Sequence, residues 1–417
     1  MSTARWFAPE RSVAAAWASA VAWLWRLGPR AAEPTAGAVG FGTSADARAL
    51  GELVASARLA GAVLLDGAED AGNGGAVSRE GRILTVDIHP ELDWGTVRGA
   101  SAYPAMAEFV VDVLDGPIAM LPPIGCLRID DSPGTAQRQV QGTAKGDAFQ
   151  ARRFRKLIQA YHRNESVLNL AVVANAFDEE RRWVPMDRVW PDAIAAMRAG
   201  VEAGAYEPVC HGLQHLDTEE LAQGRIEFRE FASLSAEEAA SHIDRALAWA
   251  GRALGEPTSF VAPAWAYGDH GRQAAHARGL TTWSRPVAGP LIDGAEVHET
   301  LFGDLPGLQG IDYAPLVALA AAGLPPTVTL HGGLIDGRSA RPRRLGDLPT
   351  LARLAYRRDL ERLPALAGVR WLGATEYTRL LRAHSSTEVV GDEVRLGDGA
   401  AAVRLDRSGR TELGATP

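Results

Sequence analysis

Hydrophobic positions after residue 120 fall into short apolar runs, and amphipathic stretches with helical spacing separate most of these runs. Short apolar runs bounded by turn residues indicate buried strands, whereas apolar positions three and four residues apart indicate helices. Strands that alternate with helices favour parallel βαβ units, and about seven such repeats favour a closed or nearly closed barrel with its chemistry at the carboxyl ends of the strands. The expected strands cover residues 124–129, 167–173, 208–210, 259–262, 281–283, 327–330 and 369–372.

The segments on either side of this pattern predict smaller units. Residues 1–35 contain an apolar stretch at 13–27, which is shorter than the roughly 20 residues of a membrane span and carries Arg26. We expect a packed amphipathic helix there, with a signal sequence as the alternative. Residues 36–120 predict a small α/β region, and residues 385–417, with their Gly-Asp turns, predict β-hairpins. The catalytic domain is then expected at residues 121–384.

Composition and charge exclude several classes of protein. The chain has 417 residues, of which 47% are hydrophobic and 23% charged, as in ordinary soluble globular proteins. A formal net charge of -8 and the absence of a basic run exclude the usual nucleic-acid partners. The only two cysteines, Cys126 and Cys210, exclude a disulfide framework, so we expect reduced, buried thiols, with a single bridge as the alternative. Without a convincing signal peptide we expect a cytoplasmic protein, with secretion as the alternative.

Two adjacent carboxylates follow the first strand of the predicted catalytic domain. Asp130 and Asp131 are followed by Ser132, Pro133 and Gly134, which break a strand. Neighbouring side chains on a strand point to opposite faces, so both carboxylates can face one site only if the strand ends there. A solvated, Asp-rich turn is the alternative interpretation of such a pair.

Two histidines follow the predicted strand 208–210 directly. Imidazoles four residues apart, at His211 and His215, can lie on one face of a helical turn and reach a single ion. With ten histidines in the chain this spacing can arise by chance, but its place at a strand end strengthens the prediction. One added carboxylate gives a set that suits zinc with open positions, and Co, Ni, Mn or Fe fit similar ligands.

Two further groups stand at strand ends. His331 follows the β-rich run 327–330, where a general acid would be wanted, and a capped or core histidine is the alternative. Pro263, Trp265 and Tyr267 follow the strand 259–262 and are candidate substrate-binding residues. The two aromatic side chains could stack on a sugar ring or line an acyl pocket, or they could simply pack in the core.

In order and spacing, the paired aspartates, the two-histidine motif and the histidine after strand 327–330 resemble three motifs of the polysaccharide deacetylases, carbohydrate esterase family 4, which includes the nodulation-factor deacetylases. Residues 260–265 resemble that family's third motif. The residues of the first two motifs, Arg-Ile-Asp-Asp and His-Gly-x-x-His, most resemble those of a poorly characterised bacterial branch of the family. The resemblance implies a distorted or incomplete (β/α)7 barrel with a small N-terminal α/β region and a short C-terminal β element. It implies Asp131, His211 and His215 as metal ligands, Asp130 as base and His331 as acid.

The implied reaction is hydrolysis of an N-acylated sugar or a related amide. The metal polarises the amide carbonyl and lowers the pKa of water, Asp130 takes the proton, and His331 protonates the departing amine. The chain departs from the family pattern where an arginine usually orients the base, because Val261 and Ala262 occupy that region. Neither can donate a charged hydrogen bond, so Asp130 is expected to be held differently. The family's aspartate-tryptophan motif has no clear counterpart, although Trp283 lies on a predicted strand.

Two other functions stay open at this point. The departures motivate a catalytically silent relative that binds a carbohydrate without releasing acetate. An O-acyl esterase with the same metal site is the third interpretation, because the same polarised water attacks an ester. Comparing an O-acetyl ester with an N-acetyl sugar separates the two hydrolases.

Overall fold

The computed structural model describes part of the chain. The described residues are 38–41, 77–80, 83–86, 117–133, 144–178, 180, 182–224, 227–284, 292–299, 316–317, 320–321, 323, 325–331, 360–390 and 392–414. The predicted N-terminal helix within residues 1–35 and most of the predicted region 36–120 lie outside them.

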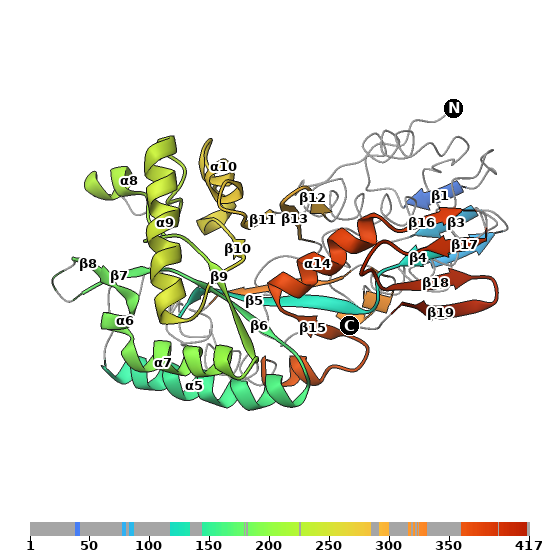
Figure 1. The fold of residues 1–417 in the computed structure, drawn as a ribbon, viewed down its shortest axis with the longest axis horizontal. Coiled ribbons are helices and arrows are strands. Elements are labelled where there is room, and N and C mark those ends of the chain that lie inside the picture. Colours follow the sequence, from blue (N-terminus) through green and yellow to red (C-terminus); the bar gives the residue numbers. More distant parts are fainter. Residues whose placement is uncertain are drawn as a thin grey trace, which may run out of the picture.

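A nine-stranded sheet forms the centre of the fold (Figure 1). Its strands are β5 (Ile124–Ser132), β6 (Leu168–Val172), β9 (Tyr206–Cys210), β10 (Ser259–Phe260), β11 (Thr281–Ser284), β12 (Ile292–Asp293), β13 (Glu296–His298), β14 (Thr327–His331) and β15 (Arg370–Leu372). The strand order is β12-β13-β11-β10-β9-β6-β5-β14, and β15 pairs with the start of β5. Only the pairing of β12 with β13 is antiparallel in the described part of this sheet. The carboxyl ends of the parallel strands therefore meet at one edge.

Every strand predicted for the catalytic domain is present, with ends that differ by a few residues. The parallel α/β architecture is thereby confirmed. Closure of the sheet into a barrel is not confirmed, because β12 and β14 are the terminal strands of an open order among the described residues. The short β12 runs against its neighbour, which interrupts the repeat of parallel strands that a barrel would need.

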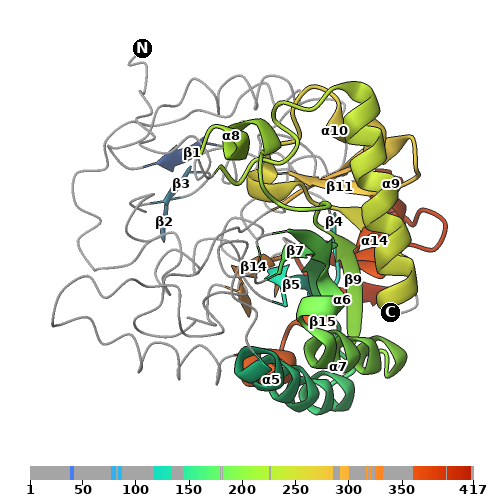
Figure 2. The same ribbon diagram turned by 90° about the vertical axis from the view of Figure 1, so that its left-hand side faces the viewer.

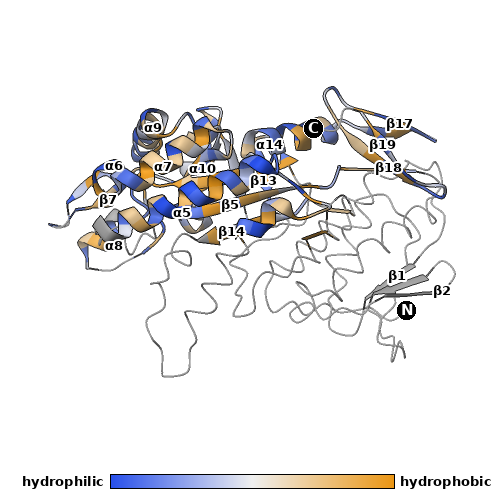
Figure 3. Ribbon diagram, turned by 90° about the horizontal axis from the view of Figure 1, so that it is seen from below, coloured by the Kyte–Doolittle hydropathy of each residue, from blue (hydrophilic) through white to orange (hydrophobic). Residues whose placement is uncertain are grey.

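Amphipathic helices cover the sheet. Helices α5 (Ala144–Arg163) and α7 (Pro191–Glu202) lie side by side, below the strands in Figure 1, and both carry hydrophilic and hydrophobic residues along their length (Figure 3). Helix α9 (Ala236–Ala253) lies beside α10 (Gly271–His276) (Figure 2), and its last residue accepts a hydrogen bond from Arg198 of α7 at 2.6 Å. A capping box between Ser235 and Glu238 starts α9. The shorter elements are β7 (Asn175–Phe177), β8 (Trp183–Pro185), α6 (Met186–Val189), α8 (Thr218–Ala222) and α14 (Ala374–Ser385).

Small β units flank the main sheet in sequence. Strands β1 (Ala38–Phe41), β2 (Val77–Glu80) and β3 (Ile83–Val86) form a three-stranded sheet within the region 36–120. The predicted C-terminal hairpins are confirmed as β16 (Glu388–Val390) with β17 (Glu393–Arg395), and β18 (Ala402–Asp406) with β19 (Gly409–Leu413). Strand β4 (Ile118–Met120) adds to β18, so the C-terminal element includes residues from before the catalytic region. The exact domain boundaries stay a prediction.

The two cysteines are buried and free, as expected from their number. Burial raises the pKa of the Cys210 thiol to about 12, so this side chain remains a protonated, unreactive core residue beside the site. No helix among the described residues has the length and apolar character needed to cross a membrane.

One buried amide ties three elements of the fold together. Asn169 on β6 is fully buried, and its Nδ2 donates to the carbonyl oxygens of Leu127 and Leu372, each at 3.0 Å. Its Oδ1 accepts from the backbone nitrogen of Ala374 at 2.7 Å. The side chain thus supplies hydrogen-bond partners to backbone groups of β5, of the end of β15 and of the start of α14.

Replacing Asn169→Ala should lower the free energy of unfolding by about 1–3 kcal/mol, because it leaves buried backbone groups without partners. Urea denaturation measures this loss. Asn164→Ala is the matched control, since Asn164 is exposed and its side chain bonds a single carbonyl. The control should cost roughly 0.5 kcal/mol. A loss at Asn169 no larger than at Asn164 would refute this role.

Candidate metal and catalytic site

Strand β5 has a local irregularity at the two adjacent aspartates, Asp130 and Asp131. The register of β5 with β6 shifts between Ile129 and Ser132, and Asp131 has a φ of 58°. This conformation is uncommon for a residue other than glycine, and bulges of this kind redirect side chains. The sequence pattern predicted that the strand ends at the aspartates, whereas β5 continues to Ser132. A register irregularity within β5, rather than a strand end, therefore lies at the two aspartates.

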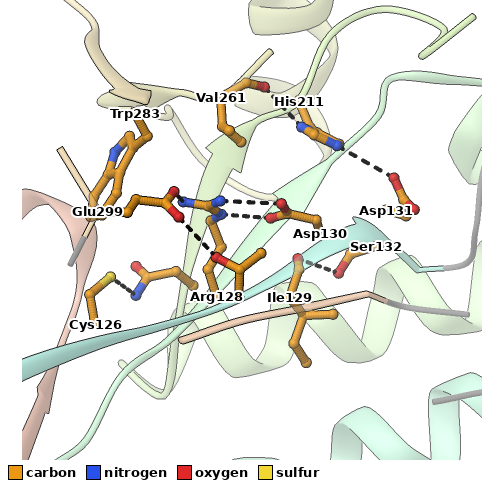
Figure 4. Close-up of polar contacts among 12 residues, drawn as sticks. Cys126, Arg128, Ile129, Asp130, Asp131, Ser132, His211, Val261, Trp283 and Glu299 are labelled. Atoms are coloured by element: carbon orange, nitrogen blue, oxygen red, sulfur yellow. Dashed lines mark hydrogen bonds and ion pairs between the residues drawn. The ribbon is translucent and has the colours of Figure 1, made fainter. Parts of the chain in front are cut away.

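Asp131, His211 and His215 come together as predicted for a metal site. The Nε2 atoms of His215 and His211 lie 2.8 and 3.4 Å from Asp131 Oδ1, and the three ligand atoms all lie within 4.8 Å of one another. All three residues are buried. Figure 4 shows the His211 ring directed at the Asp131 carboxylate from the neighbouring part of the sheet.

The two histidines meet on an irregular loop, not on the helical turn that their spacing suggested. His215 has a φ of 62° and Gly212 a φ of 94°, both incompatible with a helix. A Cβ atom on residue 212 would lie 2.3 Å from Glu230 Oε2, so only glycine fits there. The prediction of a helical turn was therefore wrong, although the two imidazoles do converge.

Glu230 shapes this histidine loop from inside the protein. Its carboxylate is fully buried and accepts hydrogen bonds from the backbone nitrogens of Leu213, Gln214 and His215, at 2.9, 3.1 and 2.7 Å. His242 on α9 lies 2.8 Å from the same carboxylate through Nδ1. The sequence analysis did not identify Glu230, because no motif or apolar run marks its position. Only the folded loop reveals its role.

The orientation of the histidine rings suits metal binding. His211 Nδ1 lies 2.8 Å from the carbonyl oxygen of Val261, which is the geometry of a donated N–H. With the proton on Nδ1, the Nε2 lone pair faces Asp131 and is free to bind a metal. The Phe228 ring packs edge-on against His215, with 5.7 Å between the ring centroids, and limits the movement of that imidazole.

The donor set fits a divalent cation. Two imidazole nitrogens and one carboxylate oxygen form a common catalytic zinc set that leaves positions open for water and substrate. Two ligands of a tetrahedral zinc ion stand about 3.4 Å apart, close to the separation of His211 from Asp131. Burial would raise the pKa of the Asp131 carboxyl, but His215 and His211 outweigh this effect and hold the pKa well below its usual value. The ionised form of Asp131, which a metal ligand requires, is therefore favoured.

Asp130 is held by an arginine of its own strand. Arg128 donates from Nε to Asp130 Oδ1 at 2.6 Å and from a terminal nitrogen to Oδ2 at 3.2 Å (Figure 4). Residues two apart on a strand share a face, which brings the two side chains together. The expectation that Asp130 is held differently from the family pattern agrees with this geometry. The motif Arg-Ile-Asp-Asp contained the signal, since the arginine precedes Asp130 by two positions.

Glu299 is a second residue that the sequence analysis missed. It directly follows β13, which no apolar run predicted, and it is 1% exposed. Its Oε1 accepts a hydrogen bond from Arg128 at 2.7 Å and lies 3.4 Å from Trp265 Nε1. Thr329 of β14 donates to its other oxygen at 3.4 Å. Trp283 lies under the guanidinium, with 5.5 Å from the ring centroid to the Arg128 carbon.

The other predicted site residues lie at the same edge of the sheet. His331 ends β14 and is the register partner of Asp130 on β5, while its side chain lies outside the described part of the chain. Pro263 is buried and Trp265 partly buried, both in the short 3-10 helix Pro263–Trp265. Tyr267 is buried, and its hydroxyl donates to the Trp283 carbonyl at 2.7 Å and accepts from the Trp283 nitrogen at 3.0 Å. This geometry favours packing over substrate contact for Tyr267.

The solved structures to which the chain is similar include members of carbohydrate esterase family 4. Among them are a peptidoglycan deacetylase from Bacillus subtilis (13% identity, 63% of this chain and 94% of that one, TM-score 0.33) and an acetyl xylan esterase from Clostridium thermocellum in complex with cobalt (14%, 62% and 91%, TM-score 0.33). A third is a pseudoenzyme of the family from Bacillus anthracis (10% identity, 62% of this chain and 66% of that one, TM-score 0.33).

No protein-family model matches the chain, and a search of the curated proteins returns no match. The chain spans about two thirds of the Bacillus anthracis pseudoenzyme. At these identities and TM-scores, the function has to be argued from the side chains of the site itself.

Replacing Glu230→Gln should weaken zinc binding by about 10- to 100-fold, because an amide cannot accept all the backbone hydrogen bonds that shape the histidine loop. Competition with a chromophoric zinc chelator measures the affinity. Glu227→Gln is the matched control, since Glu227 lies three residues away and its side chain is 49% exposed. Equal zinc affinities of the two variants would contradict the role of Glu230.

Proposed function

We propose that this chain is a metal-dependent hydrolase that removes an acetyl or other acyl group from an N-acylated sugar or a related amide. The observation that carries the proposal is the division of work between two adjacent carboxylates. Asp131 faces two imidazole nitrogens, while Asp130 faces a guanidinium. A metal-assisted hydrolase needs one carboxylate as ligand and another as base, and this arrangement supplies both.

Asp131, His211 and His215 would hold the cation, for which zinc is the best candidate and Co, Ni, Mn or Fe are alternatives. A divalent cation there polarises the acyl carbonyl and lowers the pKa of water. His211 keeps its ring in place through Val261, whereas His215 is fixed by its backbone bond to Glu230 and by ring packing on Phe228.

Asp130 is the proposed base. Arg128 donates to both oxygens of Asp130, which fixes the plane of the carboxylate. A carboxylate held in this way is a suitable group to take a proton from the attacking water. Its burial keeps competing water away from the reacting atoms, since the residue is only 2% exposed.

His331 is the proposed acid. An amine is a poor leaving group until it is protonated, so amide hydrolysis needs a proton donor within reach of the departing nitrogen. The register of β14 on β5 puts the backbone of His331 opposite that of Asp130. This position supports a pair of acid and base on neighbouring strands.

The assignment of the substrate to the N-acylated sugars rests on the motif resemblance and on one aromatic side chain at the site. Trp265 is partly buried, and its Nε1 lies 3.4 Å from Glu299 Oε1. Indole rings stack well on the apolar face of a sugar, so Trp265 is the proposed substrate contact, together with Pro263 of the same turn.

Zinc-reconstituted protein should release acetate from N-acetylglucosamine oligomers. Asp130→Asn should lower kcat by about 100-fold or more while zinc remains bound, because it removes the base and leaves the ligands. His211→Ala should abolish both zinc binding and activity. Asp244→Asn is the control, since Asp244 is an exposed aspartate that also pairs with an arginine. Full activity of Asp130→Asn, or stoichiometric zinc without hydrolysis of N-acetyl or O-acetyl substrates, would contradict the proposal.

His331→Ala should separate amides from activated esters. Its kcat on an N-acetyl sugar should fall by about 100-fold or more, whereas hydrolysis of p-nitrophenyl acetate should change little, because nitrophenolate leaves without protonation. Parallel assays of both substrates with equal zinc content measure the difference. An equal loss on the two substrates would argue against His331 as the acid.

A further inference from the structure

Two adjacent carboxylates beside one cation site present a problem of selectivity. Asp130 and Asp131 belong to the same strand end, and either could donate an oxygen to a divalent ion. Asp131 faces the histidine nitrogens, whereas Asp130 is not among the residues whose ligand atoms converge there. Some feature of the protein must keep Asp130 out of the ligand set, because a carboxylate bound to the metal is a weaker base.

Arg128 has the geometry for this task. Its guanidinium donates to both oxygens of Asp130, so rotation of the carboxylate towards Asp131 would break two charge-assisted hydrogen bonds. Both side chains are almost completely buried, so water could not replace the lost partners. Loss of such partners inside a protein is costly.

Glu299 holds the guanidinium of Arg128 in place, so the guanidinium cannot move with the Asp130 carboxylate if that carboxylate rotates. It accepts a hydrogen bond from the third nitrogen of Arg128 on the side away from Asp130 (Figure 4). Glu299 itself is held by Thr329 of β14 and lies beside Trp265. Trp283 covers one face of the guanidinium. Arg128 is thus fixed from several elements of the fold.

We propose that Arg128, fixed by Glu299, is a positioning residue that keeps Asp130 from binding the metal and so leaves it available as the base. The pair Arg128 and Glu299 takes the place of the arginine that Val261 and Ala262 do not supply. This inference rests on the proposed function, because it assumes a cation at Asp131, His211 and His215.

The test compares the zinc affinities of the unmodified protein, a double variant, Asp130→Asn and the combination of all three substitutions. In the double variant Arg128→Met with Glu299→Gln, one positive and one negative charge are removed, so the net charge of the core is unchanged. Asp130 should then bind zinc as an additional ligand. The affinity should rise, and kcat should fall by about 100-fold or more because the base is lost. Adding Asp130→Asn to the double variant should return the affinity to that of the unmodified protein, whereas Asp130→Asn alone should leave it unchanged.

A second variant covers the case in which the double variant does not fold. Arg128→Lys retains the positive charge in the core, but one ammonium cannot hold both carboxylate oxygens in a fixed plane. The same rise in affinity, reversed by Asp130→Asn, is expected. Arg278→Met is the matched control, because it removes an arginine that donates to both oxygens of Asp244 away from the site. Its zinc affinity should equal that of the unmodified protein.

The outcomes distinguish this inference from the proposed function. Unchanged zinc affinity in both the double variant and Arg128→Lys would overturn the role of Arg128, even if the unmodified protein is an active hydrolase. Zinc binding without hydrolysis by the unmodified protein would overturn the hydrolase, while the comparison of zinc affinities would still decide the role of Arg128. A protein that binds no zinc would overturn both.

Discussion

The ion pair between Arg128 and Asp130 is the interaction on which the chemistry of this edge of the sheet depends. Isolated charges are costly to bury, and removal of one partner from a buried pair leaves the other uncompensated. Burial would lower the pKa of Arg128, but Asp130 and Glu299 offset this effect and raise the pKa, so the guanidinium stays charged. Asp130 and Glu299 thus share one permanent positive charge, whereas Asp131 faces His211 and His215. A divalent cation between Asp131 and the histidines would add positive charge beside these buried carboxylates.

Glu230 is a further buried carboxylate that, like Glu299, fixes another part of the site. Glu230 receives three backbone N–H groups of the histidine loop, which would otherwise lack partners inside the protein. The positive φ angles at Gly212 and His215 are the local consequence of folding a chain around this carboxylate. The two carboxylates differ in what they hold. Glu299 holds a side chain, whereas Glu230 holds a stretch of backbone.

Much of this arrangement could be predicted from sequence, and the exceptions have physical causes. Strands β5 and β14 each contain a short, mostly apolar or β-branched run, Ile124 to Ile129 and Thr327 to Leu330, so their positions were evident. Strand β13 was missed because its three residues include Glu296 and His298 and form no apolar run. The separation of Asp130 from Asp131 by a bulge was missed because a bulge depends on the pairing of two strands, which a single sequence does not display.

The residues of the site also divide into those that could be predicted from sequence and those that could not. The paired aspartates and the two histidines were recognised from their places after strands, because parallel strand ends meet at one edge of a sheet. The choice of Asp131 as the ligand came from the motif resemblance. Glu230 and Glu299 act through contacts with residues that are not their sequence neighbours. Glu230 bonds backbone groups that lie 15 to 17 residues before it, and Glu299 lies 171 residues after Arg128. Spacing along the chain carries no signal for such contacts. Arg128 lay within a recognised motif, and the alternation of side chains along a strand would have been enough to pair it with Asp130.

The most direct measurement of the central claim is the position of zinc in crystals of the zinc-loaded protein, located by anomalous scattering at the zinc absorption edge. The account predicts one strong peak about 2.0–2.2 Å from His211 Nε2, His215 Nε2 and an oxygen of Asp131, with Asp130 still paired to Arg128. Zinc bound elsewhere, or bound by Asp130 in the unmodified protein, would contradict it.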